Sequence, residues 1–213
     1  LVTQHLKLVN RQSSGGGGPA QEHRRPPRQG AHRGRTRARG EDAARAGVNS
    51  IDHGTFADGP ALQAMKANGV WLVPTLMAFT GLRDRVGKNV YTPVVEVKAR
   101  QALDQWGRAL AAARRQGVKI AYGTDAGVFE HGRNGEEAEL MVRLGGMSPR
   151  EVMVSATTGA AELLGIATET GTLDPGKSAD LIAVEGDPLV DPTAVQRVGY
   201  VMVKGRPIPM KGQ

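Results

Sequence analysis

The sequence predicts an α/β fold with a parallel sheet, followed by a small β element. Between residues 41 and 164, short apolar segments alternate with helical segments, an order that is typical of parallel βαβ units. After residue 165, two further apolar segments follow each other without a long helix between them. A change in composition near residue 41 separates this body from a basic N-terminal arm.

The arm, residues 1–40, has nine basic residues and one acidic residue, whereas residues 41–213 have 19 and 20. It contains four consecutive glycines and shows no hydrophobic period after Val9. The arm has too little apolar surface to offset the entropy lost on ordering, so we predict that it is disordered. Its arginines leave nucleic-acid or polyanion binding open as an alternative function. The absence of aromatic residues for base stacking argues against nucleic acid as a partner.

The helices of the body are predicted from their caps and apolar spacing. Gly69 and Gly117 follow two helical segments as left-handed caps, and the segment 148–151 is a capping box with proline at its first helical position. Helices are expected over 41–46, 60–68, 93–116, 135–144 and 148–164. Strands are expected over 48–51, 70–74, 118–122, 181–184 and 198–203, and a boundary rich in glycine and proline near 165–176 divides the body.

Composition excludes several classes of protein. The absence of cysteine rules out disulfides, iron–sulfur clusters, thiol nucleophiles and thiolate zinc sites. No apolar run reaches the roughly 18 residues of a membrane span, so we expect no membrane partner and a cytoplasmic location. Residues 171–178 fit the P-loop pattern, but they follow a helix and precede a strand, the reverse of the P-loop order. We therefore predict no nucleotide cofactor.

Two polar side chains follow predicted strands. His53 comes after the strand 48–51 and Asp125 after the strand 118–122, with one strand between them. In a parallel barrel the carboxyl ends of the strands meet at one rim. The 72 positions from His53 to Asp125 are somewhat more than two barrel units of about 31 residues each. An imidazole and a carboxylate there suit a divalent metal such as zinc, with the carboxylate as general acid/base. Packing for His53 and a turn or helix cap for Asp125 remain alternatives.

Six motifs occur along the body in a fixed order. They are SIDHGT (50–55), VWLVPT (70–75), GTDAG (123–127), ATTGAAELLG (156–165), GTLDPGKSADL (171–181) and VMVKG (201–205). Together they resemble the last three barrel strands and the tail of the metal-dependent amidohydrolase superfamily, in its imidazolonepropionase-like and dipeptidase-like branch. The resemblance covers about residues 41–213.

The resemblance implies the C-terminal part of a (β/α)8 TIM-type barrel at 41–168, followed by part of a small β-sandwich at 169–213. It implies that His53 and Asp125 are metal ligands and that Asp125 is the general acid/base. His131, in the loop after Asp125, is a candidate substrate contact, with an exposed loop residue as the alternative. An intact relative would hold one or two divalent ions, zinc by this expectation, and hydrolyse a carbon–nitrogen bond in a small amide, cyclic amide or peptide-like substrate. A homo-oligomer is left open.

The sequence also departs from the family pattern. The His-x-His pair of the first strand, the strand-four lysine or acid and the strand-five histidine have no match. Residues 33–40 stand where the strand-five motif is expected, so a mistranslated segment is an alternative to a disordered arm. Two plausible ligands fall short of the three that a catalytic zinc usually has. We expect little or no activity from this chain alone, and a non-functional fragment is a further alternative.

Overall fold

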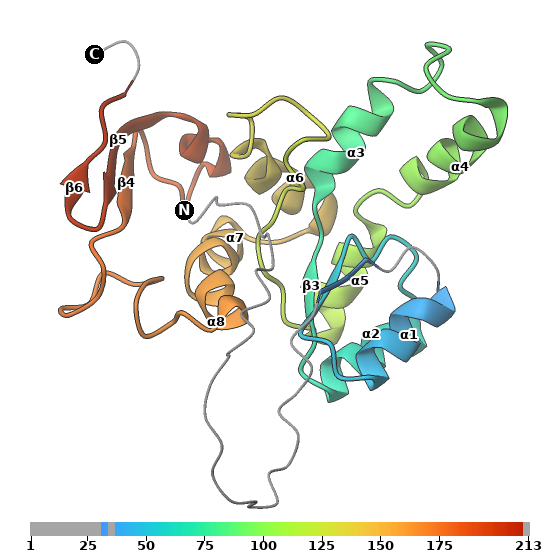
Figure 1. Ribbon diagram of the computed structural model, residues 1–213, viewed down its shortest axis with the longest axis horizontal. Coiled ribbons are helices and arrows are strands. Elements are labelled where there is room, and N and C mark those ends of the chain that lie inside the picture. The colour runs from blue at the N-terminus through green and yellow to red at the C-terminus, as the bar shows by residue number, and fades with distance from the viewer. Residues whose placement is uncertain (1–30, 34–36, 211–213) are drawn as a thin grey trace, which may run out of the picture.

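The computed structural model describes residues 31–33 and 37–210. Figure 1 shows a parallel sheet with its helices at the right, an antiparallel sheet at the left, and the helices α7 (Pro149–Val154) and α8 (Ala160–Leu164) between them. The parallel sheet has the order β1-β2-β3, and the antiparallel sheet has the order β4-β5-β6. No helix in the described part of the chain is long and apolar enough to cross a membrane.

The parallel sheet consists of short strands, of which β2 and β3 are mostly buried. β1 (Ala31–Arg33), β2 (Ser50–Asp52) and β3 (Trp71–Val73) are parallel, with Ile51 opposite Leu72. Residues 118–122 continue the sheet beside β3, because Leu72 N donates to Lys119 O at 2.8 Å and Ala121 N donates to Leu72 O at 3.0 Å. The predicted parallel arrangement is thus confirmed.

The prediction of a disordered arm through residue 40 is wrong for its last part. Residues 31–33 form β1, and α1 (Arg37–Arg45) begins four residues before the helix expected at 41–46. β1 is stabilised by its hydrogen-bond ladder with β2, which composition cannot predict. α1 packs against α2 and buries Ala43 and Ala44. The rest of the predicted arm, 1–30 and 34–36, lies outside the described residues.

The helices cover the parallel sheet and bury a main hydrophobic core, beside a smaller cluster of Trp71, Val73 and Ala121. They are α2 (Gly59–Ala67), α3 (Leu76–Arg83), α4 (Pro93–Leu103), α5 (Arg108–Gln116), α6 (Glu136–Gly145), α7 (Pro149–Val154) and α8 (Ala160–Leu164). Ile51 and Leu72 of the sheet, Met65 of α2 and Leu110 of α5 are all almost completely buried in this core. Burial of such side chains contributes about 1.5–3 kcal/mol each.

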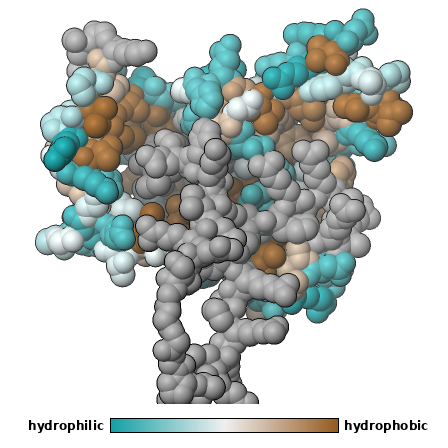
Figure 2. Space-filling view, in the orientation of Figure 1, coloured by the Kyte–Doolittle hydropathy of each residue, from teal (hydrophilic) through white to brown (hydrophobic). Residues whose placement is uncertain are grey.

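The single helix predicted over 93–116 is instead two helices. Gly107 precedes α5 with a φ of 78°, and a Cβ there would lie 2.5 Å from Leu144 Cβ. The break therefore lets the end of α6 approach closely. α4 projects outward, and Figure 2 shows apolar surface at the upper right, where α4 lies, with Val94 and Val97 more than half exposed.

A π-helical turn, η1 (Ser155–Gly159), joins α7 to α8. The carbonyl of Ser155 accepts a hydrogen bond from Tyr122 N at 3.0 Å. A π turn inserts an extra residue into the helical ladder and leaves carbonyls for other donors. This turn is thereby attached to the segment that leads to Asp125.

The C-terminal sheet is antiparallel. β4 (Leu181–Val184) pairs with β5 (Val198–Val203), and β5 pairs with β6 (Arg206–Pro207). A short 3-10 helix, η2 (Pro192–Gln196), packs against α6 and buries Ala194 and Val195.

Candidate active site

Three neighbouring strand segments deliver polar residues to one edge of the parallel sheet. His53 follows β2, Thr75 follows β3 after Pro74, and Asp125 follows the segment 118–122. Because the strands are parallel, their carboxyl ends lie at the same edge. His53 Nε2 lies 3.8 Å from Asp125 Oδ2, so the two residues predicted from the sequence are brought together.

These residues share an unusual backbone conformation. His53, Thr75 and Asp125 have φ values of 67°, 49° and 53°, and they are three of the five non-glycine residues with positive φ in the described chain. Such conformations cost about 1–3 kcal/mol each and concentrate at functional sites. Thr75 is the most exceptional of the three, because a β-branched side chain rarely adopts this conformation.

Two glycines of the motifs allow this close packing. Gly54 follows His53 with a φ of 56°, and a Cβ there would lie 2.6 Å from Leu72 Cδ1. A Cβ at Gly123 would overlap the side chain of Val73. The glycines therefore let the segments that carry His53 and Asp125 approach β3.

His53 is buried and hydrogen-bonded to a residue that sequence analysis did not identify. Its Nδ1 lies 2.6 Å from Thr75 Oγ1, and Thr75 Oγ1 donates to the carbonyl of Pro74 at 2.8 Å. The His53 side chain is 7% exposed, whereas that of Asp125 is 25% exposed. The site thus has a buried imidazole and a more accessible carboxylate.

Glu137 of α6 is a second residue that sequence analysis missed. Its carboxylate is completely buried and accepts hydrogen bonds from Leu76 N and Met77 N, both at 2.7 Å, at the start of α3. Burial raises the pKa of Glu137 to about 8, while the two backbone hydrogen bonds act in the opposite direction. The sequence signal that indicates the burial of Glu137 is its helical spacing, because it shares the apolar face of α6 with Leu140 and Met141.

The loop between Asp125 and α6 is fixed at its base. Asn134 Nδ2 donates to Thr124 Oγ1 at 2.8 Å, and the hydroxyl of Tyr122 donates to the carbonyl of Asn134 at 2.6 Å. Burial raises the pKa of Tyr122 well above its ordinary value, so this hydroxyl remains a donor. His131, the predicted substrate contact, lies exposed in this loop.

The described residues contain no cluster of three or more His, Asp or Glu side chains able to hold a metal ion. His53 and Asp125 can supply two donor atoms, since two donors of a tetrahedral zinc ion lie about 3.4 Å apart. The sequence predicted three strands of the parallel sheet, but the structure has a further one. This strand, β1, lies beside β2 on the side away from β3, and its sequence includes His32.

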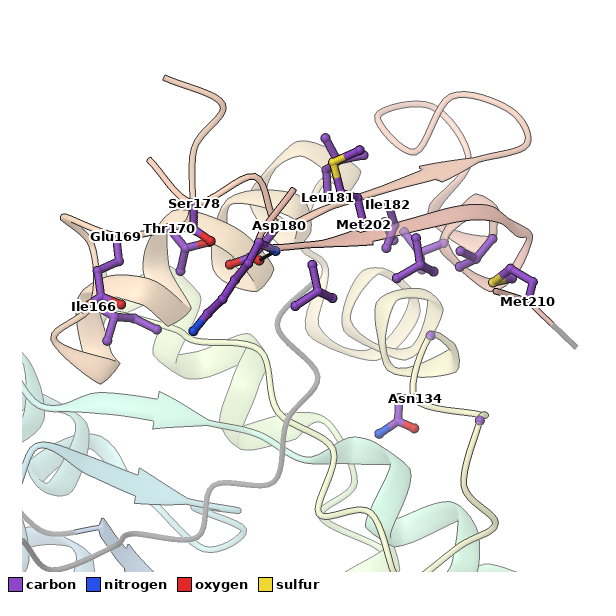
Figure 3. A pocket seen from close by; sticks show the side chains of 17 residues that line it. Asn134, Ile166, Glu169, Thr170, Ser178, Asp180, Leu181, Ile182, Met202 and Met210 are labelled. Atoms are coloured by element: carbon purple, nitrogen blue, oxygen red, sulfur yellow. Dashed lines mark hydrogen bonds between the residues drawn. The ribbon is translucent and has the colours of Figure 1, made fainter. Parts of the chain in front are cut away.

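A separate cleft of about 690 Å³ lies under the antiparallel sheet. Its lining includes Asn134, Ile166, Asp180 and Met202, and Figure 3 shows side chains of β4 and β5 along one wall. Neither His53 nor Asp125 lines this cleft. It is therefore distinct from the His53–Asp125 pair.

Parallel strands with an imidazole and a carboxylate at their carboxyl ends match the place where active sites lie in (β/α)8 barrels. Residues 30–208 match the model of the amidohydrolase family, and the chain belongs to this family. The match begins one residue before β1, which places β1 inside the family fold.

Named relatives agree with this assignment. The chain is 34% identical over 165 residues to an uncharacterized protein of Mycobacterium tuberculosis, covering 76% of this chain and 42% of that protein. It is 36% identical over 152 residues to ochratoxinase of Aspergillus niger, covering 70% and 31%. The crystal structure of a Xaa-Pro dipeptidase superimposes with a TM-score of 0.80 at 37% identity, covering 84% of this chain and 44% of that one. The chain thus spans less than half the length of these relatives and forms a partial TIM-barrel domain.

Proposed function

We propose that this chain carries part of the active site of a metal-dependent hydrolase that cleaves the carbon–nitrogen bond of a small amide or peptide-like substrate. The observation that carries the proposal is the 3.8 Å approach of His53 Nε2 to Asp125 Oδ2 at the carboxyl edge of the parallel sheet. The names of two relatives, a Xaa-Pro dipeptidase and ochratoxinase, suggest the substrate class.

The chemistry of the two donors fits a divalent cation such as zinc, which takes both imidazole nitrogen and carboxylate oxygen. We assign His53 Nε2 and an oxygen of Asp125 as ligands. One or two such ions would polarise the substrate carbonyl and lower the pKa of water to about 7. A third ligand would have to come from outside this pair.

Asp125 has the accessibility that a proton shuttle needs. Its carboxylate can remove a proton from the attacking water and return it to the leaving nitrogen, so that the carbon–nitrogen bond breaks without release of an amide anion. His53 is more deeply buried and holds its position by its hydrogen bond with Thr75. His131, in the exposed loop, is assigned a contact with the substrate.

Zinc titration by calorimetry tests the proposal. We expect His53→Ala and Asp125→Asn each to weaken zinc binding at least about tenfold, because each removes one ligand. Asp104→Asn, which makes the same chemical change at an exposed helix end, should bind zinc as the unmodified chain does. Equal zinc affinity in all four proteins would contradict the proposal.

Hydrolysis of Xaa-Pro dipeptides and N-acyl amino acids is the matching activity assay. With zinc present, Asp125→Asn should abolish any turnover that the chain supports, whereas Asp104→Asn should retain it. Turnover that persists in Asp125→Asn would remove Asp125 from the mechanism.

A further inference from the structure

The hydroxyl of Thr75 has two partners that fix its role. The carbonyl of Pro74 can only accept, so the single hydroxyl proton of Thr75 is used in the 2.8 Å bond to Pro74 O. Thr75 Oγ1 must then accept from His53 Nδ1, which lies 2.6 Å away. A neutral imidazole carries one N–H, and this arrangement places it on Nδ1.

The backbone next to Thr75 is held by Glu137 of α6. Thr75 has a φ of 49°, and the next two residues donate their backbone N–H groups to the buried carboxylate of Glu137. Since α3 begins at Leu76, Glu137 anchors the start of α3 directly after Thr75. An exposed or flexible threonine would relax to a common conformation, but this residue is 4% exposed.

We propose that Thr75 is a positioning residue, seated by Glu137, that locks the His53 ring in the Nδ1–H form. The lone pair of Nε2 then lies on the side of Asp125, at 3.8 Å from its Oδ2. The assignment of this lone pair to a cation rests on the proposed function, whereas the proton position does not. A ligand histidine whose other nitrogen is fixed in this way binds metal more strongly.

Nitrogen-15 NMR of the histidine side chains tests the proton position directly in the metal-free chain. At about pH 8.5, where an ordinary imidazole is neutral, His53 should show the Nδ1–H form. The His53→Asn spectrum assigns the signal by its loss. A wild-type His53 in the Nε2–H form would overturn the proposal, and this result does not depend on any Thr75 variant.

Three threonine variants then separate positioning from packing. Thr75→Ser keeps the hydroxyl and should keep the Nδ1–H form. Thr75→Val keeps the shape but loses the acceptor, and should shift the tautomer ratio at least about fivefold toward Nε2–H. Thr80→Val makes the same change at a buried threonine within α3 and should leave His53 unaltered. An unchanged tautomer in a folded Thr75→Val chain would overturn the proposal.

Zinc titration of the same samples links the tautomer to binding. Thr75→Val should weaken binding about tenfold or more, and Thr75→Ser should restore it. If zinc leaves the His53 signal of the wild-type chain unchanged, the proposed function fails. The tautomer assignment is decided by the metal-free spectra alone, so the two failures are distinguishable.

Discussion

Individual side chains at the carboxyl edge of the sheet are held by contacts that are distant in sequence. Thr75 reaches His53 across 22 positions, and Glu137 reaches Leu76 across 61. Each of these side chains is buried, and each fixes a residue next to or within the proposed site. The geometry of the site therefore depends on residues that do not themselves face the substrate.

The buried Glu137 makes stability depend on pH. Its pKa is about 8 in the folded chain and near its ordinary value in the unfolded chain, so between these values the folded state binds more protons. The free energy of unfolding should therefore fall as pH rises from about 5 to 8, by about 1 kcal/mol per pH unit. Urea denaturation of the wild-type chain and of Glu137→Gln measures this. A difference between them that is constant over this range would contradict the prediction.

Gly123 should be intolerant of a side chain. Gly123→Ala would force a Cβ against Val73, and overpacking of this kind costs about 1–3 kcal/mol. Urea denaturation should show the loss. Gly59→Ala is the matched control, because a Cβ at Gly59 meets nothing within 4 Å and this position has no positive φ. Equal destabilisation by both changes would show that the contact with Val73 is not the cause.

His53 and Asp125 could be found from the sequence because each directly follows a predicted strand, which is a local pattern. Thr75 and Glu137 could not be assigned in this way. Thr75 also follows a strand, but its contact with His53 depends on the pairing of β2 with β3. Glu137 lies on an apolar helical face. Only the folded structure shows the two backbone N–H groups from which its carboxylate accepts hydrogen bonds.

At the scale of helices and strands, local signals predicted the helix caps and nonlocal contacts determined the rest. Ser148 accepts from Glu151 N, and Glu151 accepts from Ser148 N, as the capping-box motif predicts. The break at Gly107 depends on Leu144 of α6, and β1 depends on pairing with β2. Neither partner is identified by the sequence near the element itself, so both features were missed.

The capping box should stabilise α7 measurably. Ser148→Ala removes the side-chain acceptor for Glu151 N and should lower the free energy of unfolding by about 1 kcal/mol. Thermal denaturation provides the measurement. Ser148→Thr retains a hydroxyl that accepts from Glu151 N and donates to Glu151 Oε2, and should lose much less. Equal losses in the two variants would indicate that the cap contributes nothing.

At the scale of the whole molecule, the chain includes the two assigned donors and spans 42% and 44% of two of its relatives. A catalytic zinc usually has three protein ligands. We therefore expect the isolated chain to retain less than one zinc ion after gel filtration, as measured by elemental analysis. Retention of a full equivalent that is lost in His53→Ala would show that the described pair already has its further ligand within this chain.

The π-helical turn 155–159 should tolerate substitutions better than single-residue deletions. The π turn holds one residue more than the α-helical ladder on either side of it, so deleting one residue there would change the rotation of α8 relative to α7. The same deletion would withdraw the Ser155 carbonyl from Tyr122, three positions before Asp125. In a library of variants, replacements within this turn should survive more often than single-codon losses, because its length matters more than its composition.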